Sequence, residues 1–296
     1  MLANVILVTY YSATKAQACI DAILETIPKS TSELHWTFVD NSEDSSDAKY
    51  IHSKLAEARN VTVIAMDHNP GFAAACNTAA RGQNAEWTLL LNPDLILDDS
   101  VIESIAEVLR EADESAMAIA FGMKTHGRMH QGVSFNSFGW FADRSYKSAQ
   151  DCYGPSGGAG AYRTSKFLSL GGFQESLFAW GEDAEFALRL KEHGCECVQA
   201  PIVIDHLGGH SIEGSRRLAA RKVELLLSNR FLIASQHYPF RLKLRFAVFA
   251  TAVVLAKMPV YAKAGAAMVA LKCYARGIVT LFRSDSFDDA YRRFGR

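Results

Sequence analysis

Short apolar runs alternate with segments of helical spacing over the first part of the chain. The apolar runs have the length of strands and end in polar residues, at 3–11, 36–42, 60–66 and 87–94. Segments with helical spacing follow them at 15–27, 48–58, 71–81 and 100–112. Strands that alternate with helices at this spacing predict a mostly parallel sheet with helices on both faces.

Polar residues gather where the predicted strands end. They are Thr9, Asp40, Asn41, Asp67, Asn69, Asn92 and Asp94. In parallel sheets, ligands bind beyond the carboxyl ends of the strands. The sequence therefore predicts a binding site at this edge.

The pattern is irregular after Ala120. A stretch rich in glycine, serine and aromatic residues runs to Gly154–Arg163 and is expected to form loops. A helix is predicted from Glu182 to Gly194, and a last strand begins at Cys197 and runs into a glycine turn.

Composition indicates an ordinary globular protein. The 296 residues are 49% hydrophobic and 21% charged, which fits one large α/β domain with an appendage, or two domains. The six cysteines are scattered, so neither a zinc knuckle nor a disulfide framework is expected. The first residues lack a basic region and a small-residue cleavage site, so the expected compartment is the cytoplasm.

Positive charge is concentrated at the C-terminal end. Residues 216–296 contain 16 Lys or Arg and 4 acids, and residues 236–284 contain eight basic residues and no acid. Lys257 and Lys263 each cost roughly 2.5–3.5 kcal/mol inside a bilayer, which disfavours a membrane span. Apolar runs at 246–256 and 264–271 favour a helical segment that lies on an anionic membrane surface. The alternative is a helical hairpin packed on the main domain. Nucleic acid is not expected as a partner, because the basic stretch has few aromatic residues.

Several common motifs are absent or incomplete. No GxxxxGK[ST] sequence occurs, which excludes a Walker-type site. The glycines at 158–163 lack the third glycine of a dinucleotide fingerprint, and Arg163 stands in its place. His206 and His210 have HxxxH spacing, but the two glycines between them argue against the helix that a zinc protease needs.

The remaining motifs occur in a characteristic order. They are VTYYSA (8–13), FVDNSEDSS (38–46), NPGFAAACNTAAR (69–81), LLLNPD (89–94), LGGFQESLFAWGEDAEFALRL (170–190) and IDHLGGHS (204–211). In this order the chain resembles a glycosyltransferase of family 2, and more narrowly its bacterial rhamnosyltransferase-like branch. The resemblance covers about residues 3–235. It implies a GT-A fold for 1–235, a Rossmann-like α/β/α sandwich with a mostly parallel central sheet. The basic, apolar pattern predicts that a helical, membrane-associating segment follows at 236–296.

The resemblance also implies a reaction and a metal site. The expected reaction is inverting transfer of a sugar, with rhamnose as one candidate, from a dTDP or UDP donor, assisted by Mg²⁺ or Mn²⁺. Residues 92–94 stand where the family often has two acids in DxD, and Asn92 replaces the first of them. Asp94 is the expected metal ligand, His206 the histidine that completes the site, and His210 its rival.

Residues that contact the two substrates follow from the same resemblance. Asp183 is the expected base that deprotonates the acceptor, with Trp180 and Glu182 beside the acceptor. A plain alternative exists, because acids are favoured at a helix N-terminus without any function. Arg189 is expected either at the substrate or paired with Glu185. The expected donor-binding residues are Thr9, Tyr11, Asp40, Asn69, Gly71, Asn77, Asn92 and Asp94.

The basic, apolar tail suggests the acceptor. We expect a glycan or a sugar on a polyprenyl diphosphate, used in cell-surface polysaccharide synthesis by an enzyme held peripherally at the inner face of the cytoplasmic membrane. A homo-oligomer stays open. Two other functions are weighed: a sugar nucleotidyltransferase, disfavoured because no glycine- and lysine-rich loop follows the first strand, and an inactive binding subunit, disfavoured by Asp94 and Asp183.

Overall fold

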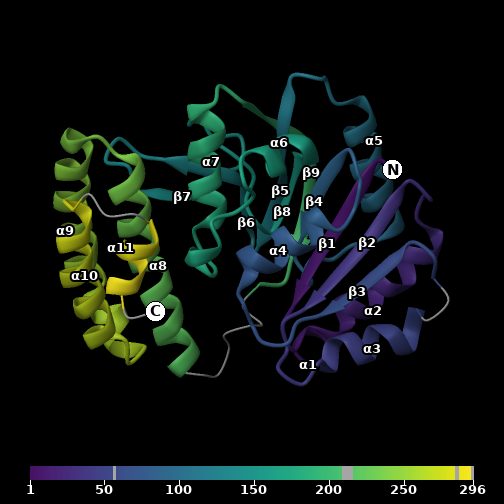
Figure 1. The fold of residues 1–296 in the computed structure, drawn as a ribbon, viewed down its shortest axis with the longest axis horizontal. Coiled ribbons are helices and arrows are strands. Elements are labelled where there is room, and N and C mark those ends of the chain that lie inside the picture. The colour runs from purple at the N-terminus through teal and green to yellow at the C-terminus, as the bar shows by residue number, and fades with distance from the viewer. Residues whose placement is uncertain (56–57, 209–215, 284–286, 295–296) are drawn as a thin grey trace.

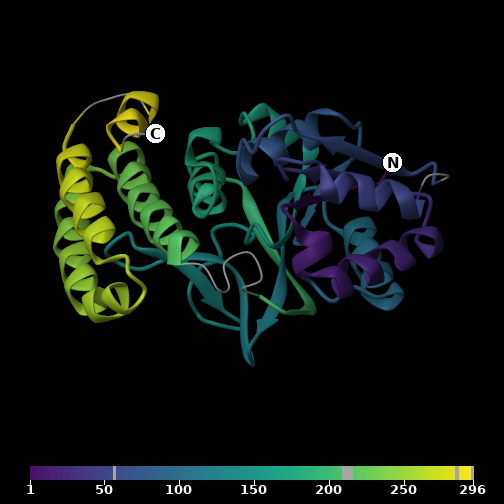
Figure 2. The ribbon, with the colours of Figure 1, turned by 90° about the horizontal axis from the view of Figure 1, so that it is seen from below.

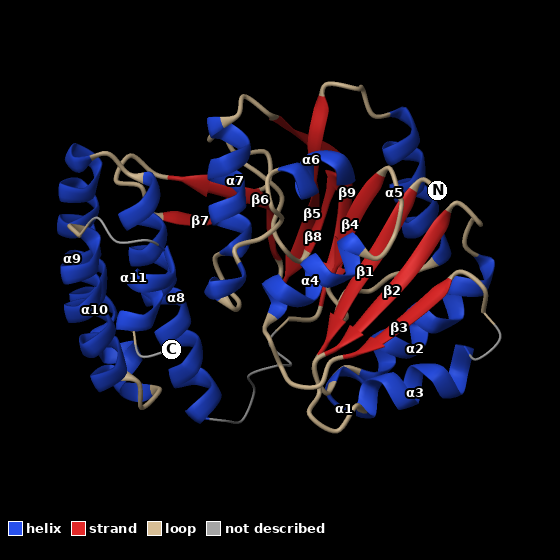
Figure 3. Cartoon of the chain, in the orientation of Figure 1, coloured by secondary structure: helices blue, strands red, loops and turns tan. Residues whose placement is uncertain are grey.

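The computed structural model describes residues 1–55, 58–208, 216–283 and 287–294. His210, the predicted rival metal ligand, lies outside them. The described residues form one nine-stranded sheet in the order β3-β2-β1-β4-β8-β5-β6-β7, with β9 beside β5 (Figure 3). The strands are β1 (Ala3–Thr9), β2 (Leu34–Asp40), β3 (Val61–Ala65), β4 (Trp87–Leu91), β5 (Ala116–Thr125), β6 (Arg128–Phe135), β7 (Phe141–Ser145), β8 (Ala159–Arg163) and β9 (Glu196–His206).

The sheet is parallel in its first half and mixed beyond it. Strands β1 to β4 pair in parallel, as the apolar pattern predicts. Strand β8 is antiparallel to both β4 and β5, and β6 and β7 continue as antiparallel strands. The expectation of loops between residue 120 and residue 163 is therefore wrong. The hairpin from β5 to β6 turns at His126 and Gly127, which both have positive φ, 48° and 76°.

Helices cover both faces of the sheet (Figure 1). Helices α2, α3 and α5 pack on one face, and α4, α6 and α7 pack on the other. Their bounds are α1 (Ser12–Lys15), α2 (Gln17–Thr26), α3 (Ser46–Leu55), α4 (Phe72–Arg81), α5 (Asp99–Glu111), α6 (Thr164–Ser169) and α7 (Glu182–Glu192), with short 3₁₀ turns η1 (Ile27–Lys29) and η2 (Glu175–Leu177).

The C-terminal helices form a layer at the end of the molecule where β6 and β7 lie (Figures 1 and 2). They are α8 (Arg216–His237), α9 (Phe240–Lys263), α10 (Ala267–Leu281) and α11 (Phe287–Arg293). Trp140, from the loop between β6 and β7, stacks on Phe246 of α9 at 5.7 Å between ring centroids. Phe231 of α8 packs in the same core. The helices thus pack on the main domain, and the boundary predicted after residue 235 falls near the end of α8.

Helix α9 leaves much of its apolar surface uncovered. Among the described residues it is the one helix long and apolar enough to cross a membrane by length and composition, and 17% of its most apolar stretch is buried. Val248 and Leu255 are 70% and 65% exposed. Phe240 of α9 and Phe282, directly after α10, are both exposed, and their ring centroids lie 6.0 Å apart.

Candidate active site

Asp94 and His206 meet although 111 residues separate them in the chain. Nε2 of His206 lies 3.0 Å from Oδ1 of Asp94, and each side chain is 15% exposed. The backbone fixes this meeting, because the N–H of Leu207 donates to the carbonyl of Asp94 at 3.1 Å. On the other side of the ring, Nδ1 of His206 lies 2.9 Å from Oγ1 of Thr125. The imidazole is therefore oriented with Nε2 toward the carboxylate.

A cavity of about 760 Å³ connects this pair with Asp183. Two glycines, Gly157 and Gly158, stand between them. The N–H of Gly157 donates to Oδ2 of Asp183 at 3.0 Å, and the carbonyl of Gly158 accepts from the N–H of Asn92 at 2.9 Å. A Cβ on Gly158 would lie 2.9 Å from Nδ2 of Asn92, so a larger residue at this position would push the Asn92 side chain aside. In the sequence, Gly158 stands out only as the start of an incomplete dinucleotide fingerprint, and Gly157 only as part of a glycine-rich stretch.

Burial changes the acidity of the two acids at the start of α7. Desolvation raises the pKa of Asp183 to about 6, while the hydrogen bond from Gly157 lowers it and the charge of Asp143 raises it. Desolvation and the neighbouring Asp183 raise the pKa of Glu182 to about 8. Both carboxyls therefore hold their protons to higher pH than exposed ones, and Asp183 is the more readily ionised of the two. Oε2 of Glu182 is buried without a hydrogen-bond partner among the described residues.

The loop before α7 is bent sharply into the cavity. Phe178 and Trp180 both have φ of 64°, which is uncommon for residues other than glycine. Asn229 of α8 holds this bend, since its Nδ2 donates to the carbonyls of Leu177, Ala179 and Trp180 at 2.9–3.0 Å. Gly71, with φ of 96°, allows the close approach, because a Cβ there would lie 2.5 Å from the carbonyl oxygen of Phe178.

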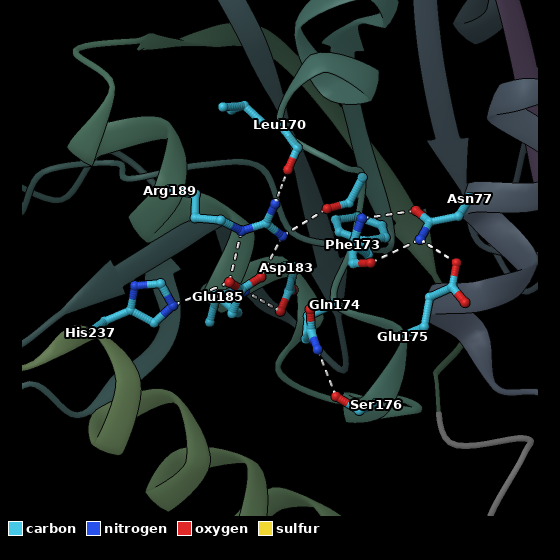
Figure 4. Close-up of polar contacts among 12 residues, drawn as sticks. Asn77, Leu170, Phe173, Gln174, Glu175, Ser176, Asp183, Glu185, Arg189 and His237 are labelled. Carbon is cyan, nitrogen blue, oxygen red and sulfur yellow. Dashed lines mark hydrogen bonds and ion pairs between the residues drawn. The ribbon is translucent and has the colours of Figure 1, made fainter. Parts of the chain in front are cut away.

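Two polar clusters hold the chain at residues 170–175, just before this loop (Figure 4). Arg189 donates from Nε to Glu185 at 2.7 Å and from Nη1 to the carbonyl of Leu170 at 2.6 Å, so the pairing with Glu185 is confirmed. His237 of α8 reaches the same carboxylate at 3.2 Å. Asn77 exchanges hydrogen bonds with the backbone of Phe173 at 2.8 Å. Both clusters support the loop and do not themselves line the cavity.

The predicted substrate residues divide into two groups. Those that line the cavity are Asn69, Gly71, Asn92, Asp94, Trp180, Glu182, Asp183 and His206. Those that do not are Thr9, Tyr11, Asp40 and Asn77. Asp40 is fully buried, and its two oxygens accept from the N–H groups of Ser42 and Ala48, both at 2.7 Å. In this structure Asp40 therefore caps a turn and a helix, and a contact with a nucleotide base would require that arrangement to open.

Tyr11 is displaced from the cavity by its backbone. It has a left-handed conformation, with φ of 55°, and its N–H donates to Oγ of Ser42 at 2.8 Å. Its neighbour Tyr10 lines the cavity, as does Lys15, whose Nζ lies 5.2 Å from the centroid of the Tyr10 ring.

Comparison with known proteins identifies the family. The protein-family model described as glycosyl transferase family 2 matches residues 4–171, which is more than half of the chain. This chain belongs to glycosyl transferase family 2. A second model, described as the N-terminal domain of galactosyltransferase, matches residues 143–209. The comparison with curated proteins gave no significant match.

Solved glycosyltransferase structures share the fold. A mannosyltransferase from Pyrobaculum calidifontis aligns with a TM-score of 0.55 at 15% identity, over 99% of this chain and 85% of that one. Residues 1–349 of TarS from S. aureus align with a TM-score of 0.54 at 17% identity, over 96% of this chain and 94% of that one. GalNAc-T7 aligns with a TM-score of 0.58 at 13% identity. The alignment covers 79% of this chain and 47% of GalNAc-T7, so this chain spans about half the length of that protein. At these identities the likeness shows the fold alone, and the GT-A fold is confirmed.

The Asp94–His206 pair of this family 2 chain fits a divalent cation. Two adjacent ligands of an octahedral ion, each about 2.1 Å from it, lie about 3.0 Å apart. The observed 3.0 Å between Oδ1 and Nε2 matches that separation. The hydrogen bond of Nδ1 to Thr125 is the support that metal-binding histidines usually have. Among the described residues no third His, Cys, Asp or Glu completes a cluster, so water and substrate phosphates would fill the other positions.

Sequence reasoning missed the wall that α8 contributes. Lys222, Leu226 and Arg230 of this helix line the cavity together with the start of α7. Their spacing of four residues places them on one helical face. That repeat was visible in the sequence, but only the fold shows that this face looks into the site.

Proposed function

We propose that this chain is an inverting, metal-dependent glycosyltransferase that moves a sugar from a nucleoside diphosphate to an acceptor hydroxyl. One observation carries the proposal: the Asp94–His206 pair and Asp183 line the same cavity. Gly157 and Gly158 lie between the pair and Asp183. Two similar structures support it, since GalNAc-T7 was solved with UDP, GalNAc and Mn²⁺, and the Pyrobaculum mannosyltransferase with GDP-Man and Mn²⁺.

Asp183 acts as the base. Its carboxylate accepts the acceptor's hydroxyl proton, the oxygen bonds to the anomeric carbon, and the bond from that carbon to the diphosphate breaks on the opposite side. Burial makes the carboxylate more basic than an exposed one, which favours proton transfer near neutral pH. Asp94 and His206 would hold a divalent cation. When bound, the cation supplies positive charge for the departing diphosphate.

The donor lies on the strand side of the cavity in this proposal. Asn69, Gly71, Asn92 and Asp94 line that side. The resemblance favours a dTDP or UDP sugar, with dTDP-rhamnose as the first candidate to test.

The exposed face of α9 and α10 rests on an anionic membrane surface in this proposal. Its uncovered apolar side chains include Val248, Leu255, Met268 and Val279, each more than half exposed at 53–70%. Residues 236–284 carry eight basic residues and no acid. Apolar burial and attraction to anionic lipid therefore act together. The acceptor is then a glycan or a polyprenyl-diphosphate-linked sugar at the cytoplasmic membrane.

A thermal-shift panel tests the proposed reaction class. UDP, dTDP and GDP sugars are added one at a time, with and without Mn²⁺ or Mg²⁺. We expect one nucleotide class to raise the melting temperature, and only when metal is present. A protein that no nucleotide sugar stabilises, or one that joins a nucleoside triphosphate to a sugar phosphate, would contradict the proposal.

A further inference from the structure

Three basic residues of α8 line the cavity, and two of them, Lys222 and Arg230, lie on one face of the helix. Lys222 and Arg230 are two helical turns apart, about 12 Å along the axis, and both line the cavity. Nζ of Lys222 lies 5.5 Å from the centroid of the Trp180 ring. Asn229, next to Arg230, binds the carbonyl of Trp180 at 3.0 Å. This part of α8 is therefore adjacent to the loop that leads into Asp183.

Neither cation forms an ion pair with a carboxylate of the described residues. Within the described part of the chain Arg230 donates only to carbonyls, from Nη1 to Leu226 at 3.0 Å and from Nη2 to Phe141 at 3.3 Å. Its Nε is buried and has no hydrogen-bond partner among the described residues. The guanidinium lies 4.6 Å and 4.4 Å from the ring centroids of Trp140 and Phe141.

Burial acts against both positive charges. Desolvation lowers the pKa of Arg230 to about 10, and it also lowers that of Lys222. Asp143 and Asp183 face the same cavity and favour the charged forms, but both stand beyond ion-pair distance. By comparison, Arg221 on the same helix has a partner in Glu224 at 2.8 Å. Desolvated charges are normally paired, so two cations on a cavity wall that have no carboxylate partner among the described residues call for an anion from outside the chain.

We infer that Lys222 and Arg230 bind a phosphate or diphosphate group of the acceptor and so present its hydroxyl to Asp183. This inference rests on the proposed function. The donor diphosphate is assigned to Asp94 and His206, on the other side of the Gly157–Gly158 strip. The anion at α8 is therefore a second one, and it belongs to the other substrate.

The helix that carries this subsite favours a lipid-linked phosphate over a soluble one. Helix α8 ends at His237, and α9, with its exposed apolar side chains, begins at Phe240. An amphiphilic acceptor could then place its phosphate at α8 and its apolar chain along α9.

Binding of farnesyl diphosphate tests the subsite on the full chain. EDTA is present, so that no divalent cation holds a diphosphate at Asp94 and His206. We expect Lys222→Gln and Arg230→Gln each to weaken binding by about ten- to a hundredfold. Arg217→Gln is the matched control, because Arg217 lies on α8, is exposed and does not line the cavity. Equal affinity of the wild type and both cavity variants would overturn the inference.

Two further ligands test whether the anion is needed for binding and whether it belongs to a lipid or is free in solution. Farnesol should bind far more weakly than farnesyl diphosphate, and equal binding of the two would overturn the anion subsite. Inorganic diphosphate that binds as tightly as farnesyl diphosphate would overturn the assignment to a lipid carrier.

Controls for folding and for the donor site complete the test. Melting temperatures are measured first, and Lys222→Gln, at a partly exposed residue, decides the matter if Arg230→Gln does not fold. Nucleotide-sugar binding with Mn²⁺ is measured on the same proteins and should be retained in both variants. Failure of the wild type to bind any nucleotide sugar would count against the proposed function, whereas unchanged farnesyl diphosphate binding in the variants counts against the subsite alone.

Discussion

At the scale of single residues, Asp183 combines a hydrogen bond that keeps it in place with burial that makes it basic. Its pKa is raised to about 6, so its ionised fraction increases as pH rises through that value. We expect kcat/KM to rise through an apparent pKa near 6, a value that belongs to the coupled Glu182–Asp183 pair.

The substitution Asp183→Asn checks this assignment. Loss of the base should lower turnover by about 10²–10⁴-fold and remove the limb near pH 6 from the rate profile. Nucleotide binding should stay unchanged. A variant that keeps the limb would show that another group titrates.

Glu182 should lower stability at high pH. Its pKa is raised from 4.5 to about 8 in the folded chain, so the folded state binds more protons than the unfolded state between those values. The free energy of unfolding therefore falls as pH rises through this window. We expect Glu182→Gln to be more stable than the wild type at pH 8–9, on the order of 4 kcal/mol, and the difference to vanish near pH 4. Denaturant titrations at several pH values measure it, and a difference independent of pH would contradict the assignment.

At the scale of elements, the loop from η2 to α7 depends on α8. Removing the amide in Asn229→Ala leaves the carbonyls of Leu177, Ala179 and Trp180 without their donor. We expect a loss of roughly 2–3 kcal/mol in unfolding free energy and a fall in turnover larger than any change in donor affinity. Ser228→Ala is the control, since the Ser228 hydroxyl donates to the carbonyl of Glu224 within α8 itself. Similar melting and turnover in the two variants would show that Asn229 does not hold the loop.

The first half of the sheet could be predicted because its strands bury long apolar side chains. Val5, Leu7, Trp36 and Phe38 supply that signal. Strand β8 begins with Ala159, Gly160 and Ala161, whose small side chains give no long apolar run. The site divides in the same way. Asp94 and Asp183 stand in motifs, whereas the roles of Gly157, Asn229 and Arg230 arise from contacts across the fold that local pattern does not contain.

At the scale of the whole molecule, the C-terminal helices join the cavity to an apolar, basic surface. Removing them would expose the core around Phe231 and Phe246, so surface substitutions are the sharper test. We expect the double variant Val248→Glu with Leu255→Glu to bind phosphatidylglycerol-containing vesicles about tenfold or more weakly than the wild type. Val198→Glu, at an exposed apolar residue of β9, is the control and should bind as the wild type does. Unchanged vesicle binding by the double variant would show that this surface does not contact the membrane.

Calorimetric titration of a nucleotide sugar with Mn²⁺ into the wild type, Asp94→Asn and Asp183→Asn tests the central claim most directly when donor turnover is followed on the same samples. We expect Asp94→Asn to lose the metal-dependent binding, and Asp183→Asn to bind the donor normally but turn it over at least about a hundredfold more slowly. Normal metal-dependent binding by Asp94→Asn, or full turnover by Asp183→Asn, would contradict a site built from these two acids.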